Sequence, residues 1–152
     1  MTTTVRQILQ AKGSRVISIP PDSSVLAALR LMAEHDIGSV LITEGSRLLG
    51  IFTERDYARK VVLRGRSSSD TRVEELMTAN VLTISPSQTI DDCMLMMTNN
   101  RFRHLPVVEH GEVIGIITIG DAVKAVMAEQ EETVSQLHGY ISGDGYLTPP
   151  RQ

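Results

Sequence analysis

Apolar and polar positions along this chain switch between the two-residue period of a strand and the 3.6-residue period of a helix. An apolar run at residues 16–19 is typical of a short strand, and helical spacing of apolar residues follows over residues 25–35. Two further apolar runs, at residues 39–43 and 48–53, flank a short turn with a glycine, which indicates a β-hairpin. A helix from residue 54 to about residue 63 closes the unit. The predicted order is strand, helix, strand, strand, helix.

This order of elements returns 65 residues later without a gap, so that residues 16–62 align with residues 81–127. Ten of these 47 positions are identical, and apolar character agrees at many more, which indicates an internal duplication. The elements of the second copy are predicted at residues 81–84, 90–99, 105–108, 113–118 and 119 to about 127. Units this small cannot easily bury a core alone, so we expect the copies to pack about an approximate two-fold axis. A cleft then lies at their joint.

Segments outside the copies have simpler patterns. Short helices are predicted at residues 4–10 and 73–77, one before each copy, and residues 64–70 have the composition of a flexible linker. After residue 127, apolar residues recur at helical spacing at Val134, Leu137, Tyr140 and Ile141. We expect this helix to dock on the domain, and the glycines and prolines after it to form a loose end.

Both copies close with glycine, two apolar residues, threonine, two variable residues and aspartate, at residues 50–56 and 115–121. The pattern is typical of a strand that runs into a helix. Two interpretations are open. In the first, threonine and aspartate only cap the helix, as in a capping box with aspartate in the place of glutamate. In the second, the hydroxyl and the free N–H groups receive a phosphate, while the aspartate accepts hydrogen bonds from a vicinal diol such as ribose.

Composition narrows the classes of partner. The chain has 152 residues, of which 41% are hydrophobic, enough for one compact domain or two halves that share a core. Its net charge of -3 and its pI of about 5.8 argue against general affinity for nucleic acid or anionic membranes. We expect a cytoplasmic protein, because no apolar run reaches the roughly 20 residues of a membrane span and the N-terminus lacks a signal-peptide core. The single Cys93 excludes an internal disulfide and is expected in the core.

These features together resemble a tandem pair of CBS domains, the Bateman module. The resemblance rests on the duplicated order of elements, on the Gly-apolar-apolar-Thr-x-x-Asp motif in both copies, and on Arg-His-Leu-Pro-Val-Val at residues 103–108. It implies an α/β (α+β) fold of two β-α-β-β-α repeats about a pseudo-two-fold axis. The implied segments are repeat 1 with its N-terminal helix at residues 5–63, a linker at 64–72, repeat 2 at 73–127, and a C-terminal helix and tail at 128–152.

The family resemblance also implies a function. Such a pair is a stand-alone regulatory module for signal transduction, without catalysis, catalytic cofactor or metal, and it binds an adenosine-containing ligand in the cleft between the repeats. AMP is the first expectation, and ADP, ATP and NAD are the alternatives. Binding is then relayed to a regulated protein or to the assembly of the module itself.

Carried onto this sequence, the resemblance assigns Asp56 and Asp121 to ribose hydroxyls, with Thr53 and Thr118 near the ribose phosphate. The strand edges of each copy complete the site of the other. On the Asp121 side the expected residues are Ser18, Ile19, Pro20, Ile37, Gly38 and Ser39. On the Asp56 side they are Thr83, Ile84, Ser85, Phe102, Arg103, His104 and Pro106. Strand edges supply the apolar slot and the backbone donors and acceptors that adenine needs.

The copies differ in the cations near the expected phosphate. Arg55, Arg101 and Arg103 are expected to contact phosphate, because a guanidinium offers paired donors to its oxygens. The second copy has Gly120 in place of Arg55. We therefore expect the Asp56 side to respond more strongly to the number of phosphates.

Two other classes of protein compete with this interpretation. One is a structural dimerisation scaffold without ligand, in which both aspartates only cap helices. The other is an enzyme, which is disfavoured because the histidines lack metal-ligand spacing and no nucleophile motif or glycine-rich phosphate loop is present. Apolar residues on more than one face of the predicted helices, such as Leu31 beside Met32 and Met96 beside Met97, indicate a homodimer.

Overall fold

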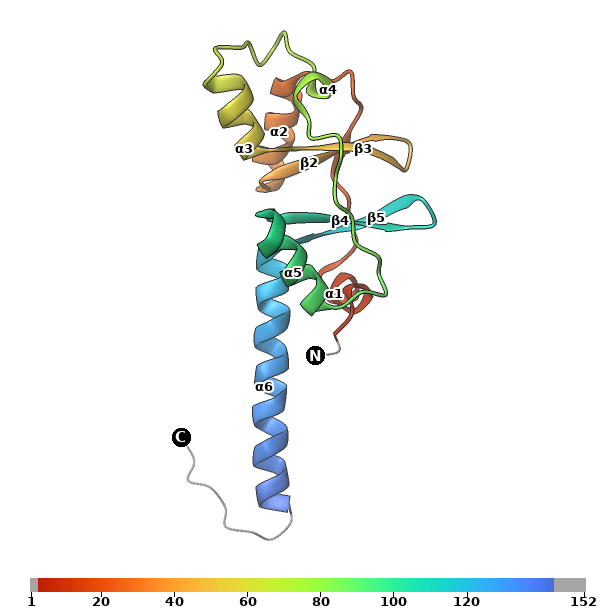
Figure 1. Cartoon of the computed structure of the whole chain (residues 1–152), viewed down its shortest axis with the longest axis vertical. Coiled ribbons are helices and arrows are strands. Elements are labelled where there is room, and N and C mark those ends of the chain that lie inside the picture. Colours follow the sequence, from red (N-terminus) through yellow and green to blue (C-terminus); the bar gives the residue numbers. More distant parts are fainter. Residues whose placement is uncertain (1–2, 144–152) are drawn as a thin grey trace.

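The computed structural model describes residues 3–143, and in it the two copies lie one above the other (Figure 1). The elements in chain order are α1 (Val5–Lys12), β1 (Ser18–Ile19), α2 (Val25–His35), β2 (Ser39–Glu44), β3 (Arg47–Thr53), α3 (Glu54–Asp56), the π-helix η1 (Tyr57–Val62), α4 (Val73–Leu76), α5 (Ile90–Asn100), β4 (His104–Glu109), β5 (Glu112–Thr118) and α6 (Ile119–Gly143). The expected mixed α+β fold is confirmed.

Each repeat contains one small sheet. In the first repeat, β1 runs parallel to β2, and β2 pairs antiparallel with β3. The second sheet is the two-stranded hairpin of β4 and β5. The two hairpins match in register: Leu41 lies opposite Ile51, and their equivalents Pro106 and Ile116 lie opposite each other. Both predicted hairpins are therefore confirmed, although β1 covers only two residues of the expected strand.

The strand predicted at residues 81–84 is wrong. This segment makes a single parallel bridge to β4, at Ile84. The reason lies in Pro106. In the first repeat the equivalent Leu41 donates its N–H to the carbonyl of Ile17 at 3.1 Å, whereas proline has no N–H to donate.

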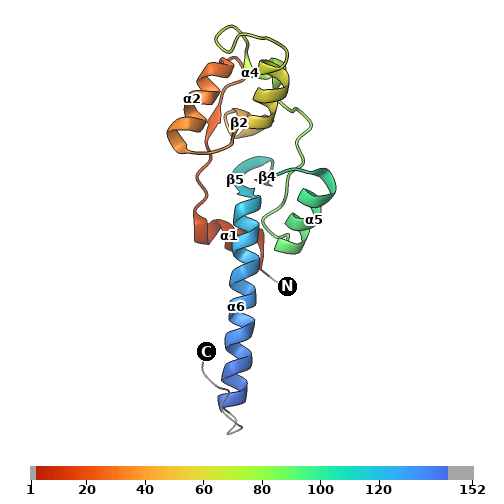
Figure 2. The ribbon, with the colours of Figure 1, turned by 90° about the vertical axis from the view of Figure 1, so that its left-hand side faces the viewer.

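The short helices α1 and α4 exchange repeats. Helix α1 precedes the first repeat but packs on the second, and α4 precedes the second repeat but packs on the first. Val5 and Ile8 of α1 are buried in the core of the second repeat, together with Cys93 of α5. Val73 and Leu76 of α4 are buried in the core of the first repeat. Figures 1 and 2 show the result, with α1 beside β4, β5 and α6 and with α4 beside α2. This exchange joins the repeats, and it confirms Cys93 as a core residue.

The repeated motif has a glycine in both copies because α1 and the end of α4 pass so close to it that a side chain would not fit. A Cβ atom on Gly50 would lie 2.5 Å from the sulfur of Met77, and one on Gly115 would lie 2.7 Å from Cδ2 of Leu9. Beside Gly50, Ile51 exchanges two backbone hydrogen bonds with Thr78, at 3.0 and 2.9 Å. Glycine therefore permits the segment after α4 to pair with the edge of β3.

The closing helices of the two repeats differ from each other and from expectation. The predicted helix from residue 54 is a short α-helix that continues as the π-helix η1. The helix predicted to end near residue 127 instead runs on to Gly143 as α6.

The expectation that the segment after residue 127 docks on the domain is wrong. Val134 is 53% exposed and Leu137 is 57% exposed, and α6 projects beyond the repeats (Figure 2). Glutamate, glutamine and alanine, which favour helix, occupy residues 128–132, and no glycine or proline interrupts the helix there. The expected loose end lies almost entirely outside the described residues. No helix within residues 3–143 combines the length and the apolar character needed to cross a membrane.

Candidate functional site

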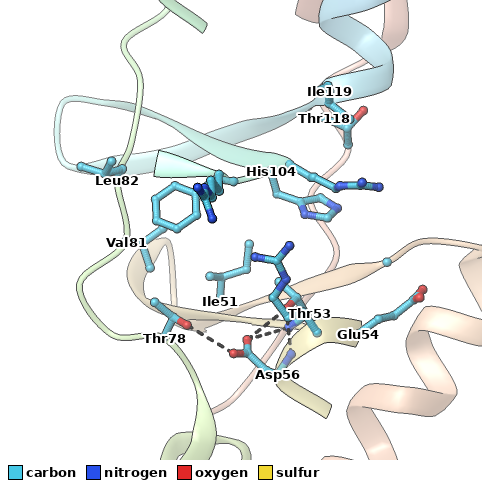
Figure 3. A pocket seen from close by; sticks show the side chains of 15 residues that line it. Ile51, Thr53, Glu54, Asp56, Thr78, Val81, Leu82, His104, Thr118 and Ile119 are labelled. Carbon is cyan, nitrogen blue, oxygen red and sulfur yellow. Dashed lines mark hydrogen bonds between the residues drawn. The ribbon is translucent and has the colours of Figure 1, made fainter. Parts of the chain in front are cut away.

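A cavity of about 490 Å³ opens between the repeats (Figure 3). The end of β3 and the start of α3 form one wall, and the segment from the end of α5 into β4 forms the opposite wall. Val81 and Leu82, from the segment that failed to form a strand, close one side together with Phe102. The cavity therefore has an apolar side and two polar walls, one from each repeat.

Asp56 borders this cavity and is only 8% exposed. Its Oδ2 atom accepts hydrogen bonds from the backbone N–H of Thr53 at 3.0 Å and from its hydroxyl at 3.2 Å, and Asp56 N–H donates to Oγ1 of Thr53 at 3.1 Å. Its Oδ1 atom accepts a hydrogen bond from the Thr78 hydroxyl at 3.5 Å and pairs with the Lys60 ammonium at 3.0 Å. The capping-box geometry is therefore confirmed. A ligand at this carboxylate would compete with Thr78 and Lys60 rather than with the cap.

Three guanidinium groups border the same cavity, those of Arg55, Arg101 and Arg103. Within residues 3–143 none of them has an ion-pair partner, although the Glu54 carboxylate also borders the cavity. Arg101 ends α5 in the left-handed conformation, with φ of 57°, and so turns the chain back toward the cavity. Three guanidinium groups that have no ion-pair partner among the described residues favour an anionic ligand.

His104 lies where this cavity meets a second one, and it borders both together with Gly38 and Thr118. Burial lowers the pKa of His104, and the positive charges of Arg103 and Lys12 lower it further. The imidazole is therefore neutral at pH 7. In that state it offers one donor and one acceptor to a bound molecule.

The second cavity, of about 400 Å³, lies between the end of α1, the start of β2 and the end of β5. Lys12, Arg15 and His35 border it. The Lys12 ammonium lies 2.6 Å from Oδ2 of Asp121 and donates to the carbonyl of Ile116 at 2.8 Å. In the first repeat, the equivalent carbonyl of Ile51 accepts a hydrogen bond from the backbone N–H of Thr78. In the second repeat, the side chain of Lys12 donates this hydrogen bond instead.

Lys12 also governs the charge of Asp121. Partial burial raises the pKa of Asp121, but the hydrogen bonds from Lys12 and Thr118 and the charge of Lys12 outweigh burial and lower this pKa below its usual value. The Thr118 N–H donates to Oδ2 at 2.8 Å, and Asp121 N–H donates to Oγ1 of Thr118 at 3.2 Å. The second motif thus forms the same cap as the first, and each carboxylate also pairs with a lysine, Asp121 with Lys12 and Asp56 with Lys60.

The structure separates the ligand-contacting residues expected from the sequence into three groups. The first cavity brings together Gly38, Thr53, Arg55, Asp56, Arg101, Phe102, Arg103, His104 and Thr118. The second brings together Ile37, Gly38, Ser39, His104 and Thr118. Neither cavity is bordered by Ser18, Ile19, Pro20, Thr83, Ile84, Ser85, Pro106 or Asp121. Within this last group, Ile19 and Ile84 are buried in the cores of the two repeats. Pro106 is also buried, but on the face of β4 opposite to the core residues Leu105 and Val107.

Sequence reasoning missed several residues that border the cavities. Val81 and Leu82 occupy the positions equivalent to Val16 and Ile17, so the repeat could have indicated their apolar wall. No local signal marked Lys12, because its approach to the second cavity depends on the packing of α1 against the other repeat.

Comparison with known proteins finds chains of the same family and fold. The profile named CBS domain matches the chain twice, at residues 4–63 and 73–128. The CBS domain-containing protein CBSX3, mitochondrial, of Arabidopsis thaliana is 36% identical over 154 residues, which cover 95% of this chain and 74% of the relative. A solved structure with CBS domains from Burkholderia ambifaria MC40-6 is 53% identical, with a TM-score of 0.81 over 84% of this chain and 96% of that chain.

A third comparison concerns a structure with bound ligands. The CBS domain pair of protein MJ0100, solved in complex with methylthioadenosine and S-adenosyl-L-methionine, is 26% identical to this chain. Its TM-score is 0.75, and the match covers 85% of this chain and 99% of that chain.

Proposed function

The chain belongs to the CBS domain family, and from this premise we propose that it is a regulatory module that binds an adenosine-containing ligand between its repeats. AMP is the ligand proposed first, and ADP, ATP and NAD are the alternatives. The complex of the MJ0100 domain pair supports this class, because both of its ligands contain adenosine. We propose ligand binding without turnover.

The observation that carries the proposal is the pairing of opposite walls in the first cavity. One wall presents the Thr53 and Asp56 pair, whose carboxylate suits a ribose diol. The facing wall presents Arg101 and Arg103, which have no ion-pair partner among the described residues. A nucleoside phosphate carries both a diol and an anion, so it offers a partner to each wall.

The apolar side of the cavity suits the base. Ile51, Val81, Leu82 and Phe102 border the cavity next to these polar walls. A purine placed there would remove apolar surface from water on both of its faces. We propose the first cavity as the principal site, because Asp56 borders it together with three arginines, whereas Asp121 borders neither cavity.

The first experiment asks whether the purified protein binds adenine nucleotide. We expect AMP to bind in calorimetric titration and to raise the melting temperature, because a ligand at a hundredfold excess over Kd stabilises the folded state by about 2.7 kcal/mol. GMP is the matched comparison, and chromatography after incubation shows whether AMP is recovered unaltered. Equal shifts with AMP and GMP would contradict reading of adenine, AMP conversion would indicate an enzyme, and absence of binding would leave the dimerisation scaffold.

The second experiment separates the phosphate from the nucleoside. Arg103→Met removes one unpaired guanidinium from the cavity, and we expect the Kd for AMP to rise about 10- to 150-fold, the effect of losing a charge-assisted hydrogen bond. Binding of adenosine should stay unchanged. Arg59→Met, on the exposed side of η1, is the matched control. Equal losses for AMP and adenosine in Arg103→Met would show that Arg103 shapes the cavity rather than binding phosphate.

We further propose that the module is a cytoplasmic homodimer that relays ligand binding to a regulated protein. Exposed apolar residues on the helices of the repeats support a pairing surface: Val62 is 56% exposed, Leu63 is 78% exposed and Leu95 is 60% exposed. Light scattering at micromolar concentration tests the assembly. A mass near the 16.7 kDa of one chain would exclude the homodimer.

A further inference from the structure

The free part of α6 carries a narrow apolar seam. Val123, Met127, Gln130, Val134 and Leu137 follow one another at intervals of four, three, four and three residues, and each of them is exposed. Four of these five side chains are apolar, with 44% of Val123, 55% of Met127, 53% of Val134 and 57% of Leu137 exposed. Alternating intervals of four and three are the spacing of a two-stranded coiled coil.

The width of the seam indicates which kind of partner fits it. A helix that docks on a globular domain has a broad apolar face, whereas a coiled coil uses two positions in seven. Around Val134 the residues next to the seam are polar, namely Glu131, Glu132, Thr133, Ser135 and Gln136. Together with Glu129 these carboxylates also disfavour an anionic membrane surface.

We propose that this seam pairs with the same seam of a second copy of the chain, as a parallel two-stranded coiled coil. The residue types at the two seam positions support this choice. Met127 and Val134 occupy the first position of successive heptads, and Val123, Gln130 and Leu137 occupy the fourth. The pair of Val134 and Leu137 is a β-branched residue at the first position with leucine at the fourth, a combination that favours two parallel strands. In such a pair Gln130 faces Gln130 of the second copy, and the two side-chain amides hydrogen-bond to each other.

Charges beside the seam are compatible with this arrangement. Lys124, Glu131 and His138 lie on one flank of the seam, and Val126 and Thr133 lie on the other. In a parallel pair each flank faces the opposite flank of the partner, so no two like charges meet across the interface.

The seam is also accessible with the repeats in place. Ala122 and Val126 pack on the second repeat, and Glu129 accepts a hydrogen bond from the backbone N–H of Thr3. At roughly 100° per residue, the seam lies roughly 100° around the helix from these contacts. The seam therefore lies on a different side of α6 from these contacts.

Cysteine pairing in the full chain tests the parallel register. In Leu137→Cys the two thiols should face each other, whereas in Gln136→Cys, the matched control, they should point apart. We expect the disulfide-linked dimer to form at least about tenfold faster in the first variant, because only there do the Cα atoms come within disulfide reach. Cys93 is buried and does not interfere. Equal rates in the two variants would overturn the proposal.

Charge insertion tests whether the seam holds the chains together. Val134→Glu with Leu137→Glu places two charges in the seam, whereas Ser135→Glu with Gln136→Glu places the same charge on the same turn outside it. We expect the mass from light scattering to halve in the first variant only, because the seam is necessary for the assembly and the surface at Val62, Leu63 and Leu95 is not sufficient by itself. AMP binding should stay unchanged in both variants. The proposal fails if the seam variant keeps the mass of the wild type, or if the wild type is already a single chain of 16.7 kDa. Because AMP binding is measured separately, neither result depends on the proposed ligand.

Discussion

Replacement of Asp56 by asparagine separates the two roles of this carboxylate. Asparagine keeps the size of the side chain but has only one oxygen. That oxygen can accept the Thr53 N–H at the cap or face the Lys60 ammonium, which lies 3.0 Å from the carboxylate, and it cannot do both. We expect Asp56→Asn to lower the free energy of unfolding by about 1–2 kcal/mol, the cost of a weakened cap and a lost partner of a part-buried ammonium. For a chain of this size the melting temperature should fall by roughly 2–8 °C.

Nucleotide affinity should fall as well if the carboxylate binds ribose. Loss of charge-assisted acceptance from two hydroxyls is worth roughly 1.5–3 kcal/mol, or about 10- to 150-fold in Kd. Calorimetric titration with adenosine and with AMP measures this change. Because both ligands contain ribose, the loss should be similar for the two.

Asp92→Asn is the control that makes this test sharp. Asp92 caps α5 through Thr89 with nearly the same geometry, because its Oδ2 accepts from the Thr89 N–H at 3.0 Å and from the Thr89 hydroxyl at 3.2 Å. Asp92 borders neither cavity. The Asp92→Asn variant should therefore be less stable than the wild type but should bind AMP with the same affinity. If Asp56→Asn and Asp92→Asn bind AMP as tightly as the wild type does, the aspartate of the motif is only a helix cap.

Three further predictions concern other parts of the structure. Gly50→Ala should destabilise the protein by at least about 1–3 kcal/mol in denaturant unfolding, because the new Cβ would lie 2.5 Å from the sulfur of Met77, and an unchanged midpoint would contradict this overlap. Lys12→Met should lower the free energy of unfolding by about 1–2 kcal/mol at pH 7. The pKa of Asp121 is lower in the folded chain than in the unfolded chain, so its ion pair stabilises the fold above the unfolded pKa and loses this effect as the pH drops through the folded pKa. The difference between variant and wild type should therefore shrink as the pH falls below about 4. The hydrogen bond from Lys12 to the carbonyl of Ile116 does not depend on pH, so a difference at pH 2 as large as that at pH 7 is the result that would refute this linkage. Cys93 should react with thiol reagents only on unfolding, because burial raises its pKa to about 11, and rapid labelling of the native chain would show that the site opens.

The amino-acid sequence by itself determined the duplication, the hairpins and the helix starts, because each depends on residues that are close in the chain. The capping pair of Thr53 and Asp56 is an example, since three residues are enough to bring its hydroxyl and carboxylate together. The failure of the strand at residues 81–84 was not encoded locally, because Pro106 lies in the partner strand β4 and only the pairing of the two segments shows why its missing N–H matters.

Only the tertiary structure decided which residues border the cavities. Lys12 reaches Asp121 because α1 packs on the second repeat, and no periodicity announces a contact between residues 109 positions apart. The side chains of Arg55 and Arg103 share one cavity because the two repeats face each other across it. The helical pattern after residue 127 was visible in the sequence. Whether its apolar side docks or stays exposed depends on where the repeats end. Helix α6 runs beyond the repeats, and Val134 and Leu137 are exposed to solvent. Local propensity specifies an element, whereas burial depends on what the rest of the chain places beside it.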